Sequence, residues 1–434
     1  MANEVRLIDI VEEFVSGDWG EECATAETPC AVSCVRGADI VPISNSRFEN
    51  IPVRYISAAS LKNRGLAEGD IIIEKSGGSP TQSTGRTVYV SKKLVEAKKS
   101  IVCSNFCQAF RIKQGWNPLY VYYYLQVVYN SGVFFNFEGK TSGLKNLILD
   151  SAFQSITIKK VPLDEQDRVA KMLSQIDEKI AANHAINDYL EAMARQLYDY
   201  WFVQFDFPDE NGRPYKSSGG KMVWNEKLRR EIPAKWKGSN ICAVADILSG
   251  GTPSKAVSEY WNGSIPFFGP TDYNGGVFQL STEEHITENG LTHCASSLFD
   301  IGTIMLTARG SIGKLVVVGT PMAMNQSCYA LKSREDEWEY LYYLTKQLIQ
   351  HLLLKGGGSV FKSITTVDIE TSFLCIGDDD VISHYTEVVR PIFKKIKNNS
   401  EEIERMTSEK EELLPLLMNG QISVRQLNNH LSAD

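Results

Sequence analysis

Two long stretches of the chain place apolar residues at alternating spacings of four and three. The first runs from Val169 to Trp201 and the second from Tyr385 to Leu417. This spacing, kept over several heptads, is typical of a coiled-coil seam, and a seam with polar members suits a helix pair better than a domain core. The pattern therefore predicts two long helices that pack against each other in antiparallel orientation. The alternative is that each helix packs only on its own domain.

The predicted seam has the same phase in both helices. Asn183 and Asn399 fall at equivalent positions, where a buried asparagine fixes register at some cost in stability. Pro391 and Pro415 are expected to break or kink the second helix near its start and near its end. The seam comprises Leu173, Ile176, Ile180, Asn183, Leu190, Leu197, Val389, Ile392, Ile396, Asn399, Ile403, Met406 and Leu413.

Short β-rich runs punctuated by glycine occupy the rest of the chain, in two similar blocks. The first block, residues 1 to about 160, has such runs at 71–73, 87–90 and 108–112 and a helical patch at 119–128. The second, residues 240 to about 377, has them at 303–306, 315–318 and 328–331 and a helix at 338–354. Each block is therefore predicted to be a mixed α+β domain.

The two blocks look like copies of one unit. The phrase Ser142–Asp150 returns as Ser359–Asp368, with Lys145 placed 217 residues before Lys362, while the helix seams repeat at an offset of 216. One insertion or deletion reconciles these offsets, so we expect an internal repeat with an approximate twofold axis. The predicted organisation is a first domain at 1–160, a helix at 161–204, a connector at 205–238, a second domain at 239–377, a helix at 378–420 and a tail at 421–434. In the connector, Trp224 and Trp236 are expected to pack against something.

Composition narrows the class of protein. A length of 434 residues with 43% hydrophobic content favours two or more globular units. The chain lacks a secretory start and an apolar run long enough for a membrane helix, so we expect a cytoplasmic protein. Nine cysteines without a zinc-like spacing indicate reduced, mostly buried thiols and no metal site.

The net charge of −8 argues at first against a nucleic-acid partner. The acidic residues, however, gather in the predicted helices and the tail. The glycine-rich loops carry Lys75, Arg86, Arg309, Lys314, Lys355 and Lys362 instead. A locally basic face therefore fits the sequence.

Three catalytic interpretations find little support. Asn117–Tyr120 partly matches the Asn-Pro-Pro-Tyr loop of adenine methyltransferases, but the second proline and a glycine motif for S-adenosylmethionine are missing. Gly310–Leu315 imitates a phosphate loop but has two residues between its glycines where four are required. A hydrolytic triad, which is recognised by geometry, has no motif here.

Glycine, hydroxyl and lysine residues combine in several loops, among them 75–79, 84–86, 250–254, 310–314 and 356–359. Such loops let backbone N–H groups and short side chains approach phosphates and base edges closely. The alternative for any one of them is an ordinary tight turn.

The order of these motifs carries a resemblance. Gly250–Ser254, Glu259–Phe267, Ala308–Lys314, Asn325–Ser327 and Gly358–Ile364, together with Leu190–Leu197 and Leu414–Ile422, strongly resemble the specificity subunits of type I restriction-modification systems. The resemblance covers essentially the whole chain. The first domain matches least, because Gly-x-x-Gly-Lys is absent there and Thr84–Arg86 is only a substitute for it.

The resemblance implies a non-catalytic DNA-binding subunit of a phage-defence system, with two target-recognition domains separated by two antiparallel coiled-coil helices. Each domain would read one half of an asymmetric target on double-stranded DNA. Its partners would be two methylation subunits, which would dock on the domains and on the helices of the seam, and motor-nuclease restriction subunits. These partners would hold the cofactors, S-adenosylmethionine, ATP and Mg. A methylation-only or other phage-defence complex is the alternative setting, and a self-contained adenine methyltransferase or a coiled-coil scaffold are rivals from other classes.

The candidate DNA-binding residues follow from the loops and the resemblance. Lys362 is expected to contact phosphate, because Lys145 repeats it in the other domain. Lys314, for which the sequence offers no counterpart, is expected to lie at or near a base. The full set is Lys75, Ser76, Ser79, Thr84, Arg86, Lys145, Thr252, Ser254, Thr271, Arg309, Ser311, Lys314, Asn325, Gln326, Ser359 and Lys362.

Overall fold

The computed structural model describes residues 4–79, 82–141, 144–355 and 363–424. The chain forms two compact units. Unit 1 is Met1–Ala182 with Glu404–Asp434, and unit 2 is Asn183–Ile403. Both long helices cross from one unit to the other, so each unit owns part of both.

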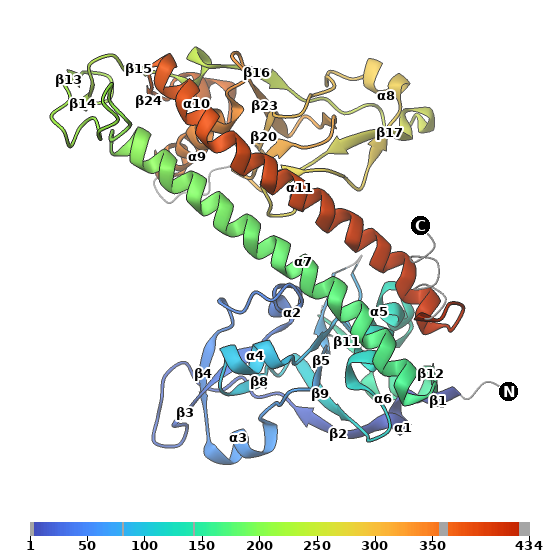
Figure 1. Cartoon of the computed structure of the whole chain (residues 1–434). Helices are drawn as coiled ribbons and strands as arrows, with labels where there is room; N and C mark the ends of the chain where they lie inside the picture. The colour runs from blue at the N-terminus through green and yellow to red at the C-terminus, as the bar shows by residue number, and fades with distance from the viewer. Residues whose placement is uncertain (1–3, 80–81, 142–143, 356–362, 425–434) are drawn as a thin grey trace. The chain divides into compact units, whose positions relative to one another are not determined.

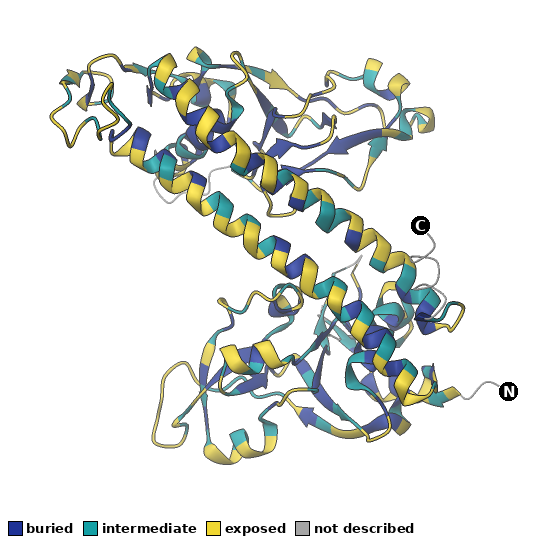
Figure 2. Cartoon of the chain, viewed as in Figure 1, coloured by how far each residue is buried: buried dark blue, intermediate teal, exposed yellow. Residues whose placement is uncertain are grey.

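Unit 1 is built on a four-stranded antiparallel sheet in the order β2-β9-β5-β7. The inner strand β5 is buried on both faces, because Ile71, Ile72 and Ile73 have no exposed surface. Figure 2 shows how the buried segments of the chain are distributed. A second sheet pairs β3 antiparallel to β4 and parallel to β8. These strands are β2 (Val11–Ser16), β9 (Cys107–Ile112), β5 (Ile71–Glu74), β7 (Thr87–Tyr89), β3 (Cys30–Val35), β4 (Val53–Ile56) and β8 (Ile101–Cys103).

Three further groups of elements complete unit 1 (Figure 1). β1 (Glu4–Arg6) pairs with β12 (Thr157–Lys159), and β10 (Glu138–Thr141), β11 (Leu144–Leu147) and β6 (Ser76–Gly77) form a small sheet. The helices before the long pair are α1 (Leu7–Ile10), α2 (Ile40–Ser44), α3 (Ala58–Arg64), α4 (Lys92–Ala97), α5 (Pro118–Asn130) and α6 (Leu149–Ser155).

Unit 2 repeats this topology. Its main sheet has the order β16-β23-β20-β21-β18, its second sheet pairs β17 antiparallel to β19 and parallel to β22, and β15 pairs with β24. The strands are β15 (Lys237–Ser239), β16 (Ala245–Ser249), β17 (Trp261–Phe268), β18 (Phe278–Gln279), β19 (His285–Ile286), β20 (Ile304–Thr307), β21 (Leu315–Val318), β22 (Ala323–Met324), β23 (Cys328–Ser333) and β24 (Leu374–Ile376). The helices are α8 (Glu288–Thr292), α9 (Trp338–Lys355) and α10 (Thr366–Glu370). The predicted internal repeat is confirmed.

The helix α5 of unit 1 corresponds to α9 of unit 2. Three tyrosines of each helix share the same spacing and are buried: Tyr120, Tyr122 and Tyr123 in α5, and Tyr340, Tyr342 and Tyr343 in α9. Burial raises the pKa of Tyr120 and Tyr122 to about 12. These aromatic side chains join the sheet of each unit to the long helices.

The two predicted long helices are α7 (Leu163–Tyr198) and α11 (Asp379–Met418), and their predicted pairing is confirmed. In unit 1, Lys410 donates to Asp177 at 2.6 Å. In unit 2, Asn399 Nδ2 donates to Asn187 Oδ1 at 2.9 Å. The paired residue number falls in α11 as it rises in α7, so the helices are antiparallel.

The asparagines of the seam make a polar layer in unit 2. Asn183 Nδ2 donates to Glu402 Oε2 at 2.9 Å, while Asn187 Nδ2 lies 3.3 Å from Ser400 Oγ. Asn183 and Asn399 are both buried, but their hydrogen bonds go to different partners: Asn183 bonds to Glu402, and Asn399 bonds to Asn187. None of the predicted seam residues is fully exposed.

A break at the prolines of the second helix is wrong, because α11 continues through Pro391 and Pro415, while a kink there stays a prediction. A proline removes the hydrogen bond to the carbonyl four residues earlier. Those carbonyls belong to Glu387 and Glu411, which are exposed, so water can take the place of the lost donor.

The connector is packed only in part as expected. Trp236 is buried, and its ring stacks on Phe207 with centroids 5.1 Å apart. Trp224 lies in the hairpin of β13 (Met222–Asn225) and β14 (Arg230–Pro233) and is 58% exposed, so its expected packing is wrong.

Candidate nucleic-acid interface

Four loops of unit 2 meet at one end of its sheets. In the main sheet, the pairs Ser249↔Tyr329, Thr307↔Cys328 and Leu306↔Leu315 place the ends of β16 and β20 beside the beginnings of β23 and β21. In the second sheet, the pair Phe268↔Met324 places the ends of the parallel strands β17 and β22 side by side. We call the loops at this end, residues 250–254, 269–276, 308–314 and 325–327, the unit 2 edge. It gathers Thr252, Ser254, Thr271, Arg309, Ser311, Lys314, Asn325 and Gln326, all predicted from sequence to contact DNA.

Backbone contacts hold the loops of the unit 2 edge together. Gly251 N–H donates to Met324 O at 3.1 Å, and Ala308 N–H donates to Ser327 O at 2.8 Å. A Cβ on Gly250 would lie 2.1 Å from the carbonyl oxygen of Asn325, so only glycine allows this approach. The hydroxyl of Thr252 bonds to the amide of Gln326.

The cations of the unit 2 edge are exposed. Arg309 and Lys314 form no ion pair with the described residues, and Lys314 Nζ lies 5.0 Å from the ring centre of Tyr273. Ser359 and Lys362 lie outside the described residues, and their predicted contacts stay predictions.

Unit 1 has an edge of the same construction. The partners Ser16↔Gln108, Glu74↔Cys107, Ile73↔Thr87 and Val35↔Cys103 bring together residues 17–20, 36–39, 75–79, 82–86 and 104–106, which we call the unit 1 edge. Lys75, Ser76, Ser79, Thr84 and Arg86 lie on it. Lys145 joins it through the pairing of β11 with β6.

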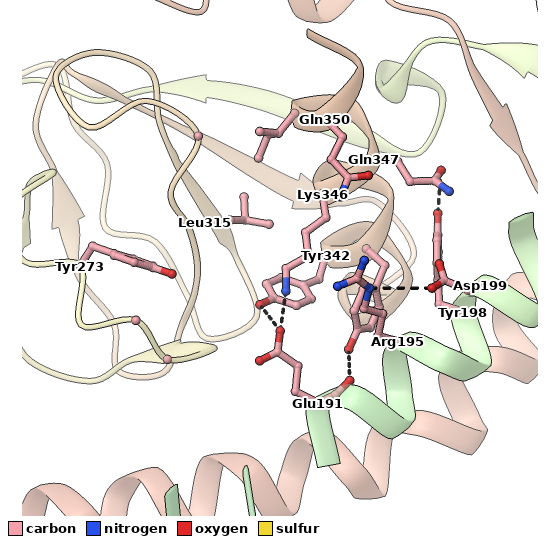
Figure 3. Close-up of a pocket in the computed structure, with 15 residues that line it drawn as sticks. Glu191, Arg195, Tyr198, Asp199, Tyr273, Leu315, Tyr342, Lys346, Gln347 and Gln350 are labelled. Atoms are coloured by element: carbon pink, nitrogen blue, oxygen red, sulfur yellow. Dashed lines mark hydrogen bonds and ion pairs between the residues drawn. The ribbon is translucent and has the colours of Figure 1, made fainter. Parts of the chain in front are cut away.

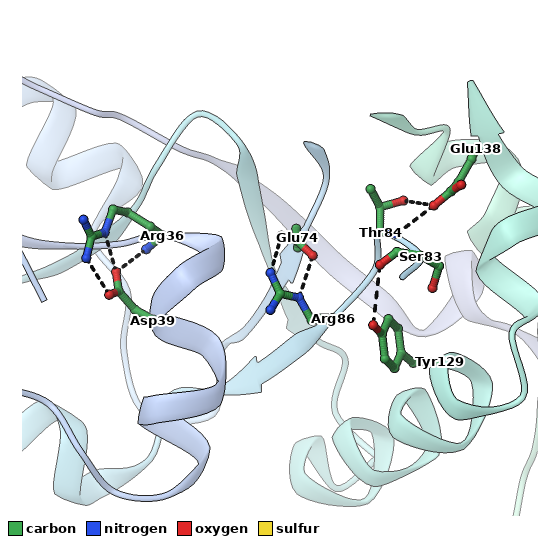
Figure 4. Close-up of polar contacts among 8 residues, drawn as sticks. All are labelled: Arg36, Asp39, Glu74, Ser83, Thr84, Arg86, Tyr129 and Glu138. Atoms are coloured by element: carbon green, nitrogen blue, oxygen red, sulfur yellow. Dashed lines mark hydrogen bonds and ion pairs between the residues drawn. The ribbon is translucent and has the colours of Figure 1, made fainter. Parts of the chain in front are cut away.

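Four of the six predicted residues of the unit 1 edge contact other side chains, and Figure 4 shows two of them, Thr84 and Arg86, bonded to carboxylates. Thr84 is fully buried and donates through its N–H to Glu138 Oε1 at 2.7 Å. Lys145 Nζ lies 3.1 Å from Glu138 Oε2. Ser76 donates its hydroxyl to Asn146. Arg86 pairs with Glu74 at 2.6 and 2.8 Å, and these hydrogen bonds raise the pKa of Arg86.

The structure identifies the counterpart of Lys314 as Arg86, which belongs to the substitute motif Thr84–Arg86. Arg86 O accepts from Glu74 N–H at 2.8 Å, as Lys314 O accepts from Thr307 N–H at 2.9 Å. Gly85 and Gly313 precede them, both with positive φ, at 98° and 81°. Arg86 therefore occupies the position of Lys314, and the premise that Lys314 has no counterpart is wrong.

Sequence reasoning missed several residues of the unit 1 edge. A Cβ on Gly17 would lie 2.0 Å from Ser104 O, which repeats the approach of Gly250 to Asn325. Asn105 then corresponds to Gln326, because each lies two residues before the cysteine that begins the equivalent strand. These cysteines are Cys107 of β9 and Cys328 of β23. The repeated Ser-Gly pairs and the repeated cysteines were signals that could have found both.

A second missed feature is an aspartate that caps one loop of each edge. Asp39 Oδ2 accepts from Arg36 N–H at 2.9 Å, and Asp272 Oδ2 accepts from Gly269 N–H at 2.7 Å. In unit 1 the side chain of Arg36 also binds Asp39, at 2.8 and 2.9 Å. Gly269 stands at that position in unit 2, so the second edge lacks this arginine.

The motifs that suggested catalysis have structural roles. Asn117 caps α5 by accepting from the N–H groups of Leu119 and Tyr120 at 2.9 and 3.1 Å, with Pro118 at the first helical position. The loop from Gly310 to Gly313 is a turn between β20 and β21.

A cavity of about 300 Å³ lies in unit 2 between α7, α9 and the loops of the unit 2 edge (Figure 3). Lys346 and Tyr342 point from α9 toward Glu191 of α7, and Arg195 lies 3.8 Å from Asp199. Its charged groups are thus paired with one another. Burial raises the pKa of Tyr342 well above its ordinary value, so this phenol stays protonated.

No group of three or more His, Cys, Asp or Glu among the described residues is placed to hold a metal ion. Burial raises the pKa of the Cys34 thiol to about 12 and that of Cys107 to about 11, which keeps these thiols protonated and unreactive. Within the described part of the chain, no helix has the length and hydropathy needed to cross a bilayer.

The family follows from a direct match. Residues 40–192 and 233–373 match the model of the type I restriction modification DNA specificity domain. The chain belongs to this family. It is the DNA specificity subunit of a type I restriction-modification system, and such subunits are non-catalytic.

Relatives of the specificity subunit match most of its length. The chain is 26% identical over 310 residues to the MjaIX specificity subunit of Methanocaldococcus jannaschii, covering 68% of this chain and 69% of that protein. It is 23% identical over 335 residues to the HindI specificity subunit of Haemophilus influenzae, covering 66% and 73%. The crystal structure of the S subunit from M. genitalium has the same fold, with a TM-score of 0.54 at 13% identity over 96% of this chain and 95% of that one.

Proposed function

We propose that the specificity subunit reads a DNA target in two separate halves, one with the unit 1 edge and one with the unit 2 edge. The observation that carries this proposal is the repetition of the same strand order, the same close glycine contact and the same turn at both edges. Two copies of one scaffold with different loop side chains suit two different half-targets, because sequence is read by side chains at base edges.

The DNA-binding residues proposed are those predicted from sequence, with Gly17, Arg36 and Asn105 added in unit 1. The negative net charge does not oppose this proposal, because the exposed cations Arg309 and Lys314 stand on the unit 2 edge while acidic residues line the outer faces of the helices. Phosphate contacts from such cations supply most of the affinity for DNA.

The helix pair is proposed to carry the other subunits and to set the spacing between half-targets. α7 has 36 residues and α11 has 40, or about 54 and 60 Å at 1.5 Å per residue. Major-groove faces on one side of DNA recur every ~34 to 36 Å. Two methylation subunits would bring S-adenosylmethionine, and motor-nuclease subunits would bring ATP and Mg.

An exchange of one recognition domain tests the proposal. Residues 240–377 are replaced by the equivalent segment of a relative; the two junctions are close, since Lys237 pairs with Ile376. We expect mapping of methylated sites in cells with the complete complex to show one new half-target beside one unchanged half-target. Exchange of the connector alone, residues 205–238, is the control and should change neither half. A change in both halves after the domain exchange would contradict the two-edge proposal.

A further inference from the structure

Arg86 is held in a fixed orientation by a buried carboxylate. Glu74 is 3% exposed and accepts from Arg86 Nε at 2.8 Å and from Nη2 at 2.6 Å. A buried carboxylate needs a partner, because an unpaired charge in the interior is strongly destabilising. The guanidinium group of Arg86 is therefore held in place along its Nε–Nη2 edge.

Two glycines make room for the carboxylate of Glu74. A Cβ on Gly37 would lie 2.5 Å from Glu74 Oε1, and a Cβ on Gly77 would lie 2.7 Å from the same atom. The carboxylate thus occupies space that a side chain at either position would compete for. Gly77 lies in the candidate loop 75–79, so this space is part of the unit 1 edge.

The other end of the guanidinium is free. Nη1 of Arg86 makes no hydrogen bond to the described residues, and 20% of the side chain is exposed at the unit 1 edge. Two donors at the end of a planar fork match the two acceptors of guanine, O6 and N7, in the major groove. A pre-oriented fork also loses less conformational entropy on binding than a flexible lysine.

We propose that Glu74 positions Arg86 to read a guanine in the half-target of unit 1. The inference rests on the proposed function of the unit 1 edge and names one base contact within it. Arg36, held by Asp39 in the same manner, lies in the neighbouring loop, since the Cβ position of Gly37 is 3.5 Å from Arg86 Nη2. In unit 2 both arginines are replaced, by Lys314 and Gly269, and Glu74 is replaced by Thr307.

The test compares two carboxylate–arginine pairs at opposite ends of β5. The variants Arg86→Lys and Glu74→Gln are made in the full chain and studied in the complete complex. The matched control is the pair of Asp70, which precedes β5, with Arg111, whose Nε lies 3.3 Å from Asp70 Oδ1. Asp70→Asn and Arg111→Lys disturb a similar buried pair away from the edge.

Mapped methylation sites and selection from a random DNA pool are the readouts. We expect Arg86→Lys to relax preference at one guanine of the unit 1 half by about 10- to 100-fold while the unit 2 half stays the same. Glu74→Gln should relax the same position by a smaller factor. Both control variants should keep the target unchanged, whatever they do to thermal stability.

Two results would overturn the inference. If Arg86→Lys kept full preference at every position, the charge alone would suffice and Arg86 would be a phosphate contact. If the control pair relaxed the target equally, loss of stability would explain the effect. Failure of the unaltered complex to methylate any defined sequence would instead overturn the proposed function.

Discussion

The two edges share a backbone and differ in how they hold their charges. At the unit 1 edge, Arg36, Arg86 and Lys145 are each paired with a carboxylate that is at most slightly exposed. At the unit 2 edge, Arg309 and Lys314 have no such partner among the described residues. A paired cation is oriented but partly neutralised, whereas an unpaired one keeps its full charge and its freedom. The same scaffold can therefore favour geometric selection in one half and electrostatic attraction in the other.

Both edges share a close contact between a glycine and a backbone carbonyl oxygen, and substitution of these glycines tests that similarity most directly. Gly17→Ala and Gly250→Ala each place a Cβ about 2 Å from a backbone oxygen, and we expect each to lower the free energy of unfolding by about 3 kcal/mol. Thermal unfolding measures the loss. Gly139→Ala, whose Cβ would have no contact closer than 3.7 Å, is the control. Two unequal losses would show that the edges are not built alike.

The helix pair differs between the units in its polar contacts, and Asn399 tests that difference. Asn399→Leu leaves Asn187 Oδ1 without its donor in unit 2 and should destabilise by about 1 kcal/mol. Changing both Asn187 and Asn399 to Leu should raise the melting temperature above that of the unaltered chain, because a polar seam layer trades stability for register. A double variant less stable than both single variants would contradict this account.

Lys314 sharpens the contrast in charge. Because no carboxylate among the described residues orients Lys314, we propose that it contacts phosphate, and the base contact predicted from sequence stays the alternative. Lys314→Ala should weaken binding to all DNA sequences alike and reduce the slope of log affinity against log salt by about 1. Binding titrations at several salt concentrations measure this. Lys332→Ala, which removes a cation paired with Asp300 near the other end of β23, is the control.

The smallest expected effect concerns the caps of α5 and α9. Glu337 precedes the first residue of α9, as the neutral Asn117 precedes the first residue of α5. Burial together with the charge of Asp379 raises the pKa of Glu337 from 4.5 to about 7. A carboxyl whose pKa is raised on folding destabilises the folded state once it must ionise. This cost is absent below about pH 4.5, grows with rising pH and is complete above about pH 7.

Glu337→Asn, which copies the cap of unit 1, should therefore raise the melting temperature at pH 8 and leave it nearly unchanged at pH 4.5. The gain should stay below about 1 kcal/mol, because solvent screens this half-buried group. Thermal unfolding at both pH values measures it. An equal gain at both would show that titration of Glu337 is not the cause.

Periodic and repeated features of the sequence predicted most of the fold. The heptads gave both long helices and their pairing, and the apolar runs at 71–73 and 315–318 gave central strands, since burial on both faces leaves a continuous apolar segment. The wrong break at Pro391 came from treating a helix alone, without the exposed surface that lets water replace the lost bond.

The unit 1 edge was harder to predict because the repeat offset is not constant. It is 233 between Ser16 and Ser249, 228 between Arg86 and Lys314, 221 between Cys107 and Cys328 and 216 between the helices. Unit 1 has extra residues in successive loops, so the single offset of 216 to 217 misaligns its edge. The pairing of Glu74 with Arg86 depends on loops that meet only in the folded unit, and no local pattern reveals it.

The division of the chain also affects the order in which its parts are completed during synthesis. Leu414, Leu417 and Val424 belong to the core of unit 1, although about 220 residues of unit 2 separate them from Ala182. At the usual ribosomal rate of 5 to 20 residues per second, roughly 10 to 45 seconds pass between the two portions of unit 1. Unit 2 is continuous in sequence and can complete its fold first. Until residues 404–424 are made, the apolar core residues of unit 1 stay exposed on the nascent chain, where a chaperone would bind them.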